Sequence, residues 1–424
     1  MKDEKRRAPA GSSLCRGARL LYVLCLLVAS AAGYCADWPQ WHGLNRDGHS
    51  PETGLLKEWP AEGLKPLWVA DGLGTGFSAV TVADGFVYAT GMAGENNEGA
   101  LSAFDLSGRR QWRTPYGPEW NDTYPGARSS PTVDTGRLYI LSSMGRLVCF
   151  NAKTGAIEWS EDMAKKFDGV MPRCGFAESL LVDGNKVICT PGGKDAGLVA
   201  LDKKTGQTLW TSRGFSDQSA YCSPILVERG GNRLIVTITA RHVVGISPVS
   251  GAVVWSQPFD TEAEDPNHSV SPVYNDGCLY ATSGHRKGGQ MFEIAADGKQ
   301  SNLKWEDTTL SNLHGGLVIV DGYLYGTNLK DKWVCLELKS GAVMYEAAGV
   351  GMGSVTYVDG MLYCYGEKGT LALVKASPKG FEIVSSFKET HGAGQHWAHP
   401  VISGGRLYIR HGDALVMYVI WSQK

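Results

Sequence analysis

The sequence lacks any adjacent pair of cysteines and any CxxC motif, although it contains ten cysteines in 424 residues. Most of them stand inside apolar runs, such as LVCF around Cys149 and WVCL around Cys335. This setting is typical of small buried side chains and favours neither a disulfide framework nor a zinc site. A GxSxG elbow and an HExxH helix are also missing, so two common hydrolase signatures are excluded.

An excess of charge of one sign is missing as well. The chain has 41 Lys and Arg against 43 Asp and Glu, a formal net charge of −2. Without residues 1–31, acidic side chains outnumber basic ones by about six. This balance argues against nucleic acid or an anionic lipid surface as the main partner.

Long apolar runs are limited to the first residues. Residues 20–32 are apolar, follow six basic side chains and end near the small residues Ala29, Ser30 and Ala31. The pattern predicts a signal peptide over residues 1–31, with cleavage after Ala36 as an alternative. We therefore expect an exported protein, in the periplasm or outside the cell, with no transmembrane segment in the mature chain.

What the sequence does have is a repeat. A small residue or proline, alternating apolar residues, a turn glycine and a second apolar strand recur eight times, at a period of about 46 residues. Period-2 strands around glycine turns predict antiparallel hairpins. The eight copies span residues 79–91, 130–142, 178–190, 223–237, 271–283, 316–328, 354–366 and 399–411.

A third strand and a further turn follow each hairpin, and an aromatic residue then opens a fourth, outer strand. A four-stranded sheet cannot bury both faces alone, so the sheets are expected to stack radially as blades. The recurrent aromatic residue would then fill the space between neighbouring blades. We expect this structural role for Trp112, Trp159, Trp210, Trp255, Trp305 and Tyr345.

The eighth repeat ends without an outer strand, whereas an unassigned strand with a Trp precedes the first repeat, at residues 64–74. We predict that this segment completes the last blade and closes the ring. The fold class is thus all-β, an eight-bladed β-propeller of four-stranded antiparallel blades. The domains are a signal peptide (1–31), a Trp-containing clasp segment (32–63) and the propeller (64–424).

The turn before the outer strand carries a family resemblance. The segments NAKTGAIEW (151–159) and LDKKTGQTLW (201–210) place Asn or Asp, Thr-Gly and Trp in order, and ISPVSGAVVW and FDLSGRRQW are degenerate copies. This pattern resembles the PQQ-type β-propeller repeat family. The resemblance implies two functional branches: quinoprotein dehydrogenases that hold PQQ and Ca²⁺, and propellers without quinone, such as the outer-membrane assembly lipoprotein.

The features that the resemblance implies for a quinoprotein enzyme are mostly missing here. Such an enzyme has a vicinal disulfide, a Trp platform and a Glu/Asn/Asp cluster for Ca²⁺, and the chain has no Cys-Cys pair. We therefore expect a non-catalytic propeller, a monomer without cofactor, that scaffolds an envelope protein or binds a carbohydrate or peptide. A PQQ-dependent alcohol or sugar dehydrogenase with PQQ and Ca²⁺ is the alternative.

Residues just before each inner strand should surround the mouth of the central channel. They are unusually polar there, which suits a pocket for an anion or metal, acid–base chemistry, or a water-lined channel. Histidines from separate blades do not define a metal site by sequence. The candidate ligand-binding residues are Arg128, Glu178, Tyr221, His268, His314, His396 and His399, with Phe77 and Met352 at equivalent places.

Two loops and one N-terminal stretch add to this prediction. Asn121, Asp122 and Arg128 in the loop before the second repeat can hydrogen-bond a carboxylate or a sugar, and Trp397 would cap the channel or pack over its loop. DWPQWHGLNRDG (37–48) is expected to be a clasp at the ring closure rather than a ligand motif. In that interpretation Trp38 and Trp41 pack near the closure, and Asn45, Arg46, Asp47 and Gly48 form a turn.

Overall fold

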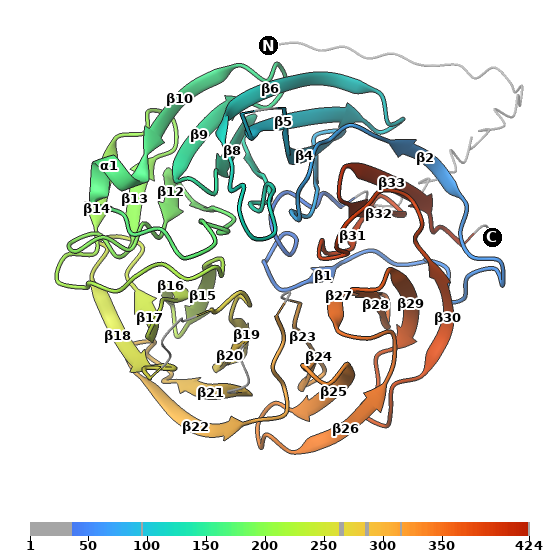
Figure 1. Cartoon of the computed structure of the whole chain (residues 1–424). Coiled ribbons are helices and arrows are strands. Elements are labelled where there is room, and N and C mark those ends of the chain that lie inside the picture. Colours follow the sequence, from blue (N-terminus) through green and yellow to red (C-terminus); the bar gives the residue numbers. More distant parts are fainter. Residues whose placement is uncertain (1–35, 95, 263–266, 285–287, 314–315, 423–424) are drawn as a thin grey trace, which may run out of the picture. The chain divides into compact units, whose positions relative to one another are not determined.

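The described part of the chain is a ring of antiparallel blades (Figure 1). The computed structural model describes residues 36–424 except 95, 263–266, 285–287, 314–315 and 423–424, so the predicted signal peptide lies outside the described residues. Seven of the described sheets have four antiparallel strands each, and the eighth has four antiparallel strands and one short parallel strand, which confirms the eight-bladed β-propeller. Each described blade runs from a short inner strand at the centre to an outer strand at the rim (Figure 1).

The first four blades follow one another along the chain, each a simple meander. They consist of β3 (Thr81–Ala83), β4 (Phe86–Ala93), β5 (Glu98–Asp105) and β6 (Arg110–Pro118); β7 (Thr132–Asp134), β8 (Arg137–Leu141), β9 (Arg146–Asn151) and β10 (Ile157–Asp162); β11 (Leu181–Asp183), β12 (Lys186–Cys189), β13 (Val199–Asp202) and β14 (Thr208–Thr211); and β15 (Ile225–Arg229), β16 (Asn232–Ile238), β17 (His242–Ile246) and β18 (Val253–Pro258). Helix α1 (Met163–Phe167) follows β10, and its first turn is capped by the Asp162 side chain.

The remaining blades repeat the meander until the last one. They consist of β19 (Val273–Asn275), β20 (Cys278–Ser283), β21 (Gly288–Ile294) and β22 (Ser301–Asp307); β23 (Val318–Val320), β24 (Tyr323–Thr327), β25 (Lys332–Glu337) and β26 (Val343–Ala348); β27 (Gly353–Val358), β28 (Met361–Gly366), β29 (Thr370–Lys375) and β30 (Ile383–Lys388); and β31 (Val401–Ser403), β32 (Arg406–His411) and β33 (Ala414–Val419).

The outer strand of the eighth blade comes from the other end of the propeller. Strand β2 (Pro66–Ala70) pairs antiparallel with β33, with Val69 opposite Val416. The N-terminal closure predicted from residues 64–74 is therefore confirmed. Pairing the last blade with an early strand gives β33 a neighbour and ties the ring shut.

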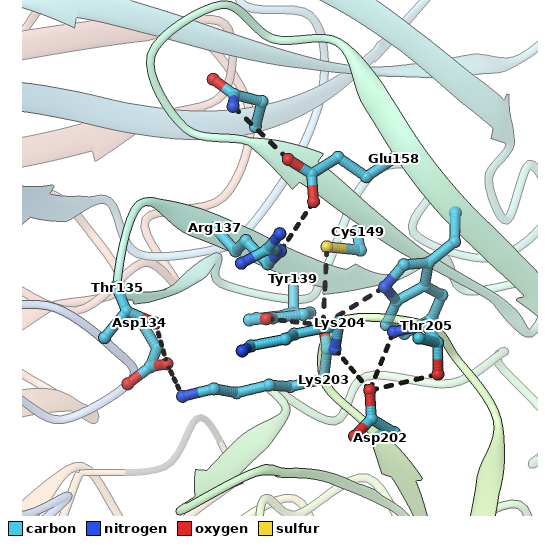
Figure 2. A network of polar contacts seen from close by, with 12 residues as sticks. Asp134, Thr135, Arg137, Tyr139, Cys149, Glu158, Asp202, Lys203, Lys204 and Thr205 are labelled. Atoms are coloured by element: carbon cyan, nitrogen blue, oxygen red, sulfur yellow. Dashed lines mark hydrogen bonds and ion pairs between the residues drawn. The ribbon is translucent and has the colours of Figure 1, made fainter.

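The seams between blades are built around the aromatic residues of the outer strands. Trp159 of β10 donates through Nε1 to the carbonyl of Lys203 in the third blade (3.2 Å). Tyr139 donates to the same oxygen at 2.9 Å (Figure 2). The Lys203 ammonium also pairs with Asp134. One carbonyl and one ammonium thus join the second blade to the third.

The turn glycine of the next blade lies directly under the indole ring. A Cβ at Gly206, where φ is +73°, would lie 2.8 Å from Cε3 of Trp159, so only glycine admits this approach. The indole–glycine contact recurs between Trp68 and Gly108, Trp112 and Gly155, Trp210 and Gly251, and Trp305 and Gly341. Trp255 instead lies over Gly245 of its own blade, and Tyr345 packs at the seam of the sixth and seventh blades.

The centre of the ring is occupied by residues 37–50, which we call the axial segment (Figure 1). Trp38 exchanges two main-chain hydrogen bonds with Val82 of the first blade, and Pro39 accepts one from Val133 of the second. The segment ends in β1 (His49–Ser50), which pairs parallel with β27 of the seventh blade. It therefore crosses from one side of the ring to the other.

Candidate functional site at the channel mouth

Two rows of residues surround the channel where the chain enters each inner strand. The residues two positions before these strands include Ser130, Ser179, Ser223 and Ser271, which we call the serine row. The residues four positions before them form the mouth row. Positions two apart in an extended chain face the same side, so both rows face the channel. Six described members of the mouth row are Phe77, Arg128, Ala177, Tyr221, Ser269 and Trp397.

The serine row is a chain of hydrogen bonds that runs from blade to blade. The amide of Ser130 donates to Oγ of Ser179 (2.9 Å), that of Ser179 to Oγ of Ser223 (2.9 Å), and that of Ser223 to Oγ of Ser271 (3.0 Å). Each hydroxyl oxygen therefore accepts a main-chain proton from the preceding blade. The arrangement satisfies buried amides that lack a strand partner at this level.

The axial segment closes the channel at the level of the serine row. Trp41 donates from Nε1 to Oγ of Ser271 in the fifth blade (3.3 Å), and its ring lies 4.3 Å from that of His399 in the eighth. His42 stacks on Trp41, and its Nε2 lies 3.0 Å from Nδ1 of His399. Burial lowers the pKa of His42 well below its ordinary value, and the neighbouring His399 lowers it further. His42 is therefore a neutral imidazole inside the channel.

Arg46 anchors the same segment to the third blade. It is buried to 3% exposure and donates to the carbonyls of Ser179 (2.7 Å) and Leu180 (3.0 Å). Burial lowers its pKa to about 10, so the guanidinium keeps its charge at neutral pH. Nearby, burial raises the pKa of Glu178 to about 8, which the Thr190 amide and the Arg46 charge only partly offset. Burial is the largest cause of both pKa shifts. The charge of Arg46 is therefore stabilised mainly by the two main-chain carbonyls and less by an ionised Glu178.

Above this closure lies a cavity of about 460 Å³, within the range typical of small-molecule sites. Its floor is formed by Trp41 and three serines of the serine row. Its walls are the mouth row and the loops that precede it. The complete lining is Trp41, Phe77, Thr123, Tyr124, Arg128, Arg173, Cys174, Ala177, Ser179, Tyr221, Ser223, Asn267, Ser269, Ser271, Leu313 and Trp397.

One wall of the cavity is aromatic. The ring of Trp397 packs between Phe77, at a centroid distance of 4.9 Å, and Tyr124, at 4.8 Å. The Arg128 guanidinium lies 5.7 Å from the centroid of Phe77, a cation–π contact. Three mutually tilted rings, from the loops before the first, second and eighth blades, thus form an apolar wall beside a cation.

Arg128 is held in place by main-chain carbonyls. Its Nε donates to Cys174 (3.0 Å), and its Nη2 donates to Tyr124 (2.9 Å). No carboxylate of the described residues lies within ion-pair distance of it. Burial lowers the pKa of Arg128 from its very high ordinary value, although the charge remains. The cavity therefore has positive potential that nothing in its described lining cancels.

The predicted mouth residues fall into two groups. Arg128 and Tyr221 line the cavity, as does Phe77. Glu178 does not, because it stands between Ala177 and Ser179 and so points into the blade, where its carboxyl accepts the Thr190 amide at 2.9 Å. Asn121 and Asp122 are exposed outside the cavity, so only Arg128 of that predicted trio is part of it.

The histidines lie mostly away from the cavity. His268 is fully buried and donates from Nε2 to the Ala240 carbonyl (3.0 Å). His396 bonds Tyr365 and stacks on His411 at 3.6 Å, and burial, followed by His411, lowers its pKa to about 4. His399 lies one level below the cavity, against Trp41. His314 lies outside the described residues.

Two residues of the lining stand directly after predicted histidines. Trp397, which the sequence already places at the channel, follows His396, and Ser269, which carries no sequence signal of its own, follows His268. Trp41 packs against the hydrophobic cluster at the ring closure, where Trp38 lies with Val401 and Tyr408, and it also lines the floor of the cavity. Arg46 lies in a local turn, in which its amide donates to the Gly43 carbonyl (3.2 Å), and its side chain also binds the third blade.

The described lining does not suit Ca²⁺. Calcium takes six to eight oxygen ligands and depends on Asp and Glu carboxylates. The described lining contains no Asp or Glu and holds two arginines. Among the described residues, no group of three or more His, Cys, Asp or Glu side chains could hold a metal ion.

The structure is an eight-bladed propeller with residues 37–50 at its centre and a cavity at the mouth of the channel. A family model described as outer membrane protein assembly factor BamB matches residues 97–347, more than half of the chain. The chain therefore belongs to this family of PQQ-like propellers. Among the described residues, no helix is both long enough and apolar enough to cross a membrane.

Curated relatives resemble part of the chain. The quinoprotein alcohol dehydrogenase PedH of Pseudomonas putida is 27% identical over 161 residues, which cover 35% of this chain and 25% of that protein. A quinoprotein ethanol dehydrogenase of Pseudomonas aeruginosa is 28% identical over 161 residues, 34% of this chain and 25% of the relative. The matched region is thus a quarter of each relative's length.

Solved structures resemble nearly the whole ring. BamB from Moraxella catarrhalis has a TM-score of 0.61 at 16% identity, covering 84% of this chain and 100% of that chain. The quinohemoprotein alcohol dehydrogenase from Comamonas testosteroni has a TM-score of 0.67 at 12% identity, covering 93% and 82%. At these identities the likeness is one of fold.

Proposed function

We propose that the chain is an exported, non-catalytic binding propeller that holds a carbohydrate or a peptide segment of an envelope protein in its mouth cavity. The observation that supports this most is the cavity itself. It is closed below by Trp41, walled by Trp397, Tyr124 and Phe77, and lined by hydroxyls and arginine. Such a mixture of flat apolar rings and a few polar groups is typical of binding sites.

Catalysis has less support from the described lining. The cavity holds no described carboxylate or imidazole that could move a proton within hydrogen-bond reach of a ligand, and a thiol at Cys174 stands beside no described base in the lining. Membership of the BamB family and the likeness to the BamB fold are consistent with a binding role in the envelope.

A screen of carbohydrate and peptide arrays with the purified protein tests the proposal, with Trp397→Ala as the site variant. The matched control is Trp421→Ala, because Trp421 is 42% exposed and lies near the Gly405 turn, outside the cavity lining. We expect Trp397→Ala to abolish capture of the ligand and Trp421→Ala to retain it. Equal capture by both variants would contradict a cavity-based function.

The curated relatives favour a second candidate, a PQQ-dependent dehydrogenase. The described lining lacks the carboxylates that would hold Ca²⁺, so we derive no catalytic step for it. The test is to add PQQ and Ca²⁺, dialyse, and record quinone absorbance and dye reduction with ethanol and glucose. Retained quinone together with alcohol-dependent dye reduction would replace the binding proposal by this one.

A further inference from the structure

We propose that the mouth cavity recognises an acidic saccharide, a sugar ring that carries a carboxylate, with Arg128 as the carboxylate-binding residue. This inference rests on the proposed binding function and adds the class of ligand. Three properties of the lining lead to it: hydrogen-bond polarity, charge and the shape of the aromatic wall.

The floor of the cavity offers protons. Oγ of Ser179, Ser223 and Ser271 each accepts an amide proton from the preceding blade, and Ser271 also accepts from Trp41. A hydroxyl has one proton and two acceptor positions. Ser271 thus uses both acceptor positions and Ser179 and Ser223 use one each, and none of the three protons has a described acceptor, so the hydroxyls can donate to a ligand above them. They suit a ligand rich in oxygen acceptors.

The wall offers a fixed positive charge. Nε and Nη2 of Arg128 are used by carbonyls of Cys174 and Tyr124, which locks the guanidinium plane and leaves Nη1 without a described partner. Arg173 adds a second guanidinium to the lining, and among the described residues no carboxylate pairs with Arg128. A guanidinium that is immobilised and partly desolvated binds a carboxylate more strongly than a free one in water.

The aromatic wall favours a ligand that contains a ring. Trp397 lines the cavity and contacts Phe77 and Tyr124 at tilts of 42° and 59°, so the wall next to Arg128 consists of apolar rings. The axial hydrogens of a pyranose can pack on such a surface while the ring hydroxyls turn toward the serine floor and the carboxylate toward Arg128. A purely aromatic acid would stack equally well but would give the three serine protons few acceptors, so the donor-rich floor favours the sugar.

Calorimetric titration with four defined probes tests this inference. Digalacturonate is compared with neutral galactobiose, and benzene-1,3,5-tricarboxylate with benzene-1,3,5-trimethanol. We expect digalacturonate to bind most tightly, at least tenfold better than galactobiose, and its affinity to fall as salt is raised. Quenching of Trp41 and Trp397 fluorescence should follow the same order.

Site variants locate the charge. Arg128→Gln should weaken digalacturonate about ten- to a hundredfold and leave galactobiose unchanged, whereas Arg109→Gln, on an exposed turn of the first blade, should change neither. Arg128→Lys should recover part of the loss. Unchanged thermal unfolding and unchanged neutral binding show that the Gln variant is folded.

The outcomes separate the inference from the function beneath it. If galactobiose binds as well as digalacturonate, or if the benzene tricarboxylate is preferred, the acidic-saccharide inference is overturned and the binding proposal stands. If none of the four probes binds but an array ligand is lost on Trp397→Ala, the inference again fails alone. If no array ligand depends on Trp397 either, both proposals fail.

Discussion

Nε2 of His42 lies 3.0 Å from Nδ1 of His399, and this contact joins the axial segment to the eighth blade. One of the two nitrogens must accept the hydrogen bond, so at least one ring must be unprotonated at that atom. The folded-state pKa of His42 is depressed, which means that the contact contributes stability above pH 6.5 and loses it as the pH falls. This relationship leads to the first prediction.

His42→Gln should be less stable than the native protein by about 1–3 kcal/mol at pH 8, because a buried hydrogen bond is disturbed. The difference in stability should shrink as the pH falls from 8 to 5. In the native protein, protons then bind the exposed imidazole of the unfolded chain more readily than the buried one, which favours unfolding, whereas the Gln variant has no imidazole at this position. Urea unfolding at several pH values measures both stabilities. A difference that stays constant with pH would show that His42 titrates normally.

Glu178→Gln should give the opposite pH trend. Burial raises the folded-state pKa of Glu178 to about 8, so the contribution of this carboxyl to stability is complete below pH 4.5 and is lost as the pH rises to about 8. The free energy of unfolding of the Gln variant, relative to that of the native protein, should therefore rise by about 2–4 kcal/mol between pH 4.5 and pH 8. Unfolding free energies at pH 4.5, 6 and 8 test it.

The control for Glu178→Gln is Glu158→Gln, which removes a surface ion pair with Arg137. Exposed pairs contribute about 0–1 kcal/mol, so its effect should be small at every pH. If the unfolding free energies of Glu178→Gln and the native protein changed with pH in parallel, Glu178 would be ionised inside the blade and its charge balanced by that of Arg46.

The contact between indole and glycine at the seam predicts that an alanine substitution destabilises the protein much more at one glycine of the third blade than at another. Gly206 (φ +73°) lies under Trp159, whereas a Cβ at Gly184 (φ +59°) meets nothing within 4 Å. Gly184→Ala should lower the free energy of unfolding by about 1–2 kcal/mol, because alanine is strained at a positive φ and meets no other obstacle. Gly206→Ala should cost about 1–3 kcal/mol more, because the ring must move. Equal midpoints in urea for the two variants would show that the seam is loosely packed.

Closure by β2 predicts a global effect from a local change. Val69→Pro places a residue with fixed φ and no N–H inside β2, opposite Val416, and should destabilise the whole propeller by about 3 kcal/mol or more in one cooperative transition. Lys65→Pro, just outside the strand, is the control. A separate low-temperature transition in calorimetry, with the main transition unchanged, would contradict closure as the source of stability.

The ring could be predicted from sequence because its signals are repeated and local. Turn glycines, period-2 strands and the Trp of each outer strand indicate blades, and the missing strand of the last repeat indicated the role of β2. The mouth could be predicted only in part. A shift of one residue turns a side chain to the other face of a strand, so Ser269 and Ala177 line the cavity whereas their neighbours His268 and Glu178 do not.

The axial segment could not be placed from sequence for a different reason. Its partners are carbonyls and hydroxyls of distant blades, such as Ser179 for Arg46 and Ser271 for Trp41, and a residue pattern does not specify such contacts. Its glycines carry a faint signal. A Cβ at Gly48 would lie 2.8 Å from Cγ1 of Val318, so the residue is small because the channel is narrow as well as because the chain turns.

The axial segment also has a consequence for how the molecule is made. The contact between His42 and His399 joins residues 357 positions apart, and β2 finds β33 across a similar interval. Such distant pairings are slow to form because the loop between them must be closed first. During synthesis β2 cannot pair with β33 until the last blade has been made, although Trp38 and Arg46 can already contact the first and third blades. Until the ring closes, β2 would lack this strand partner and would be open to a chaperone or a protease.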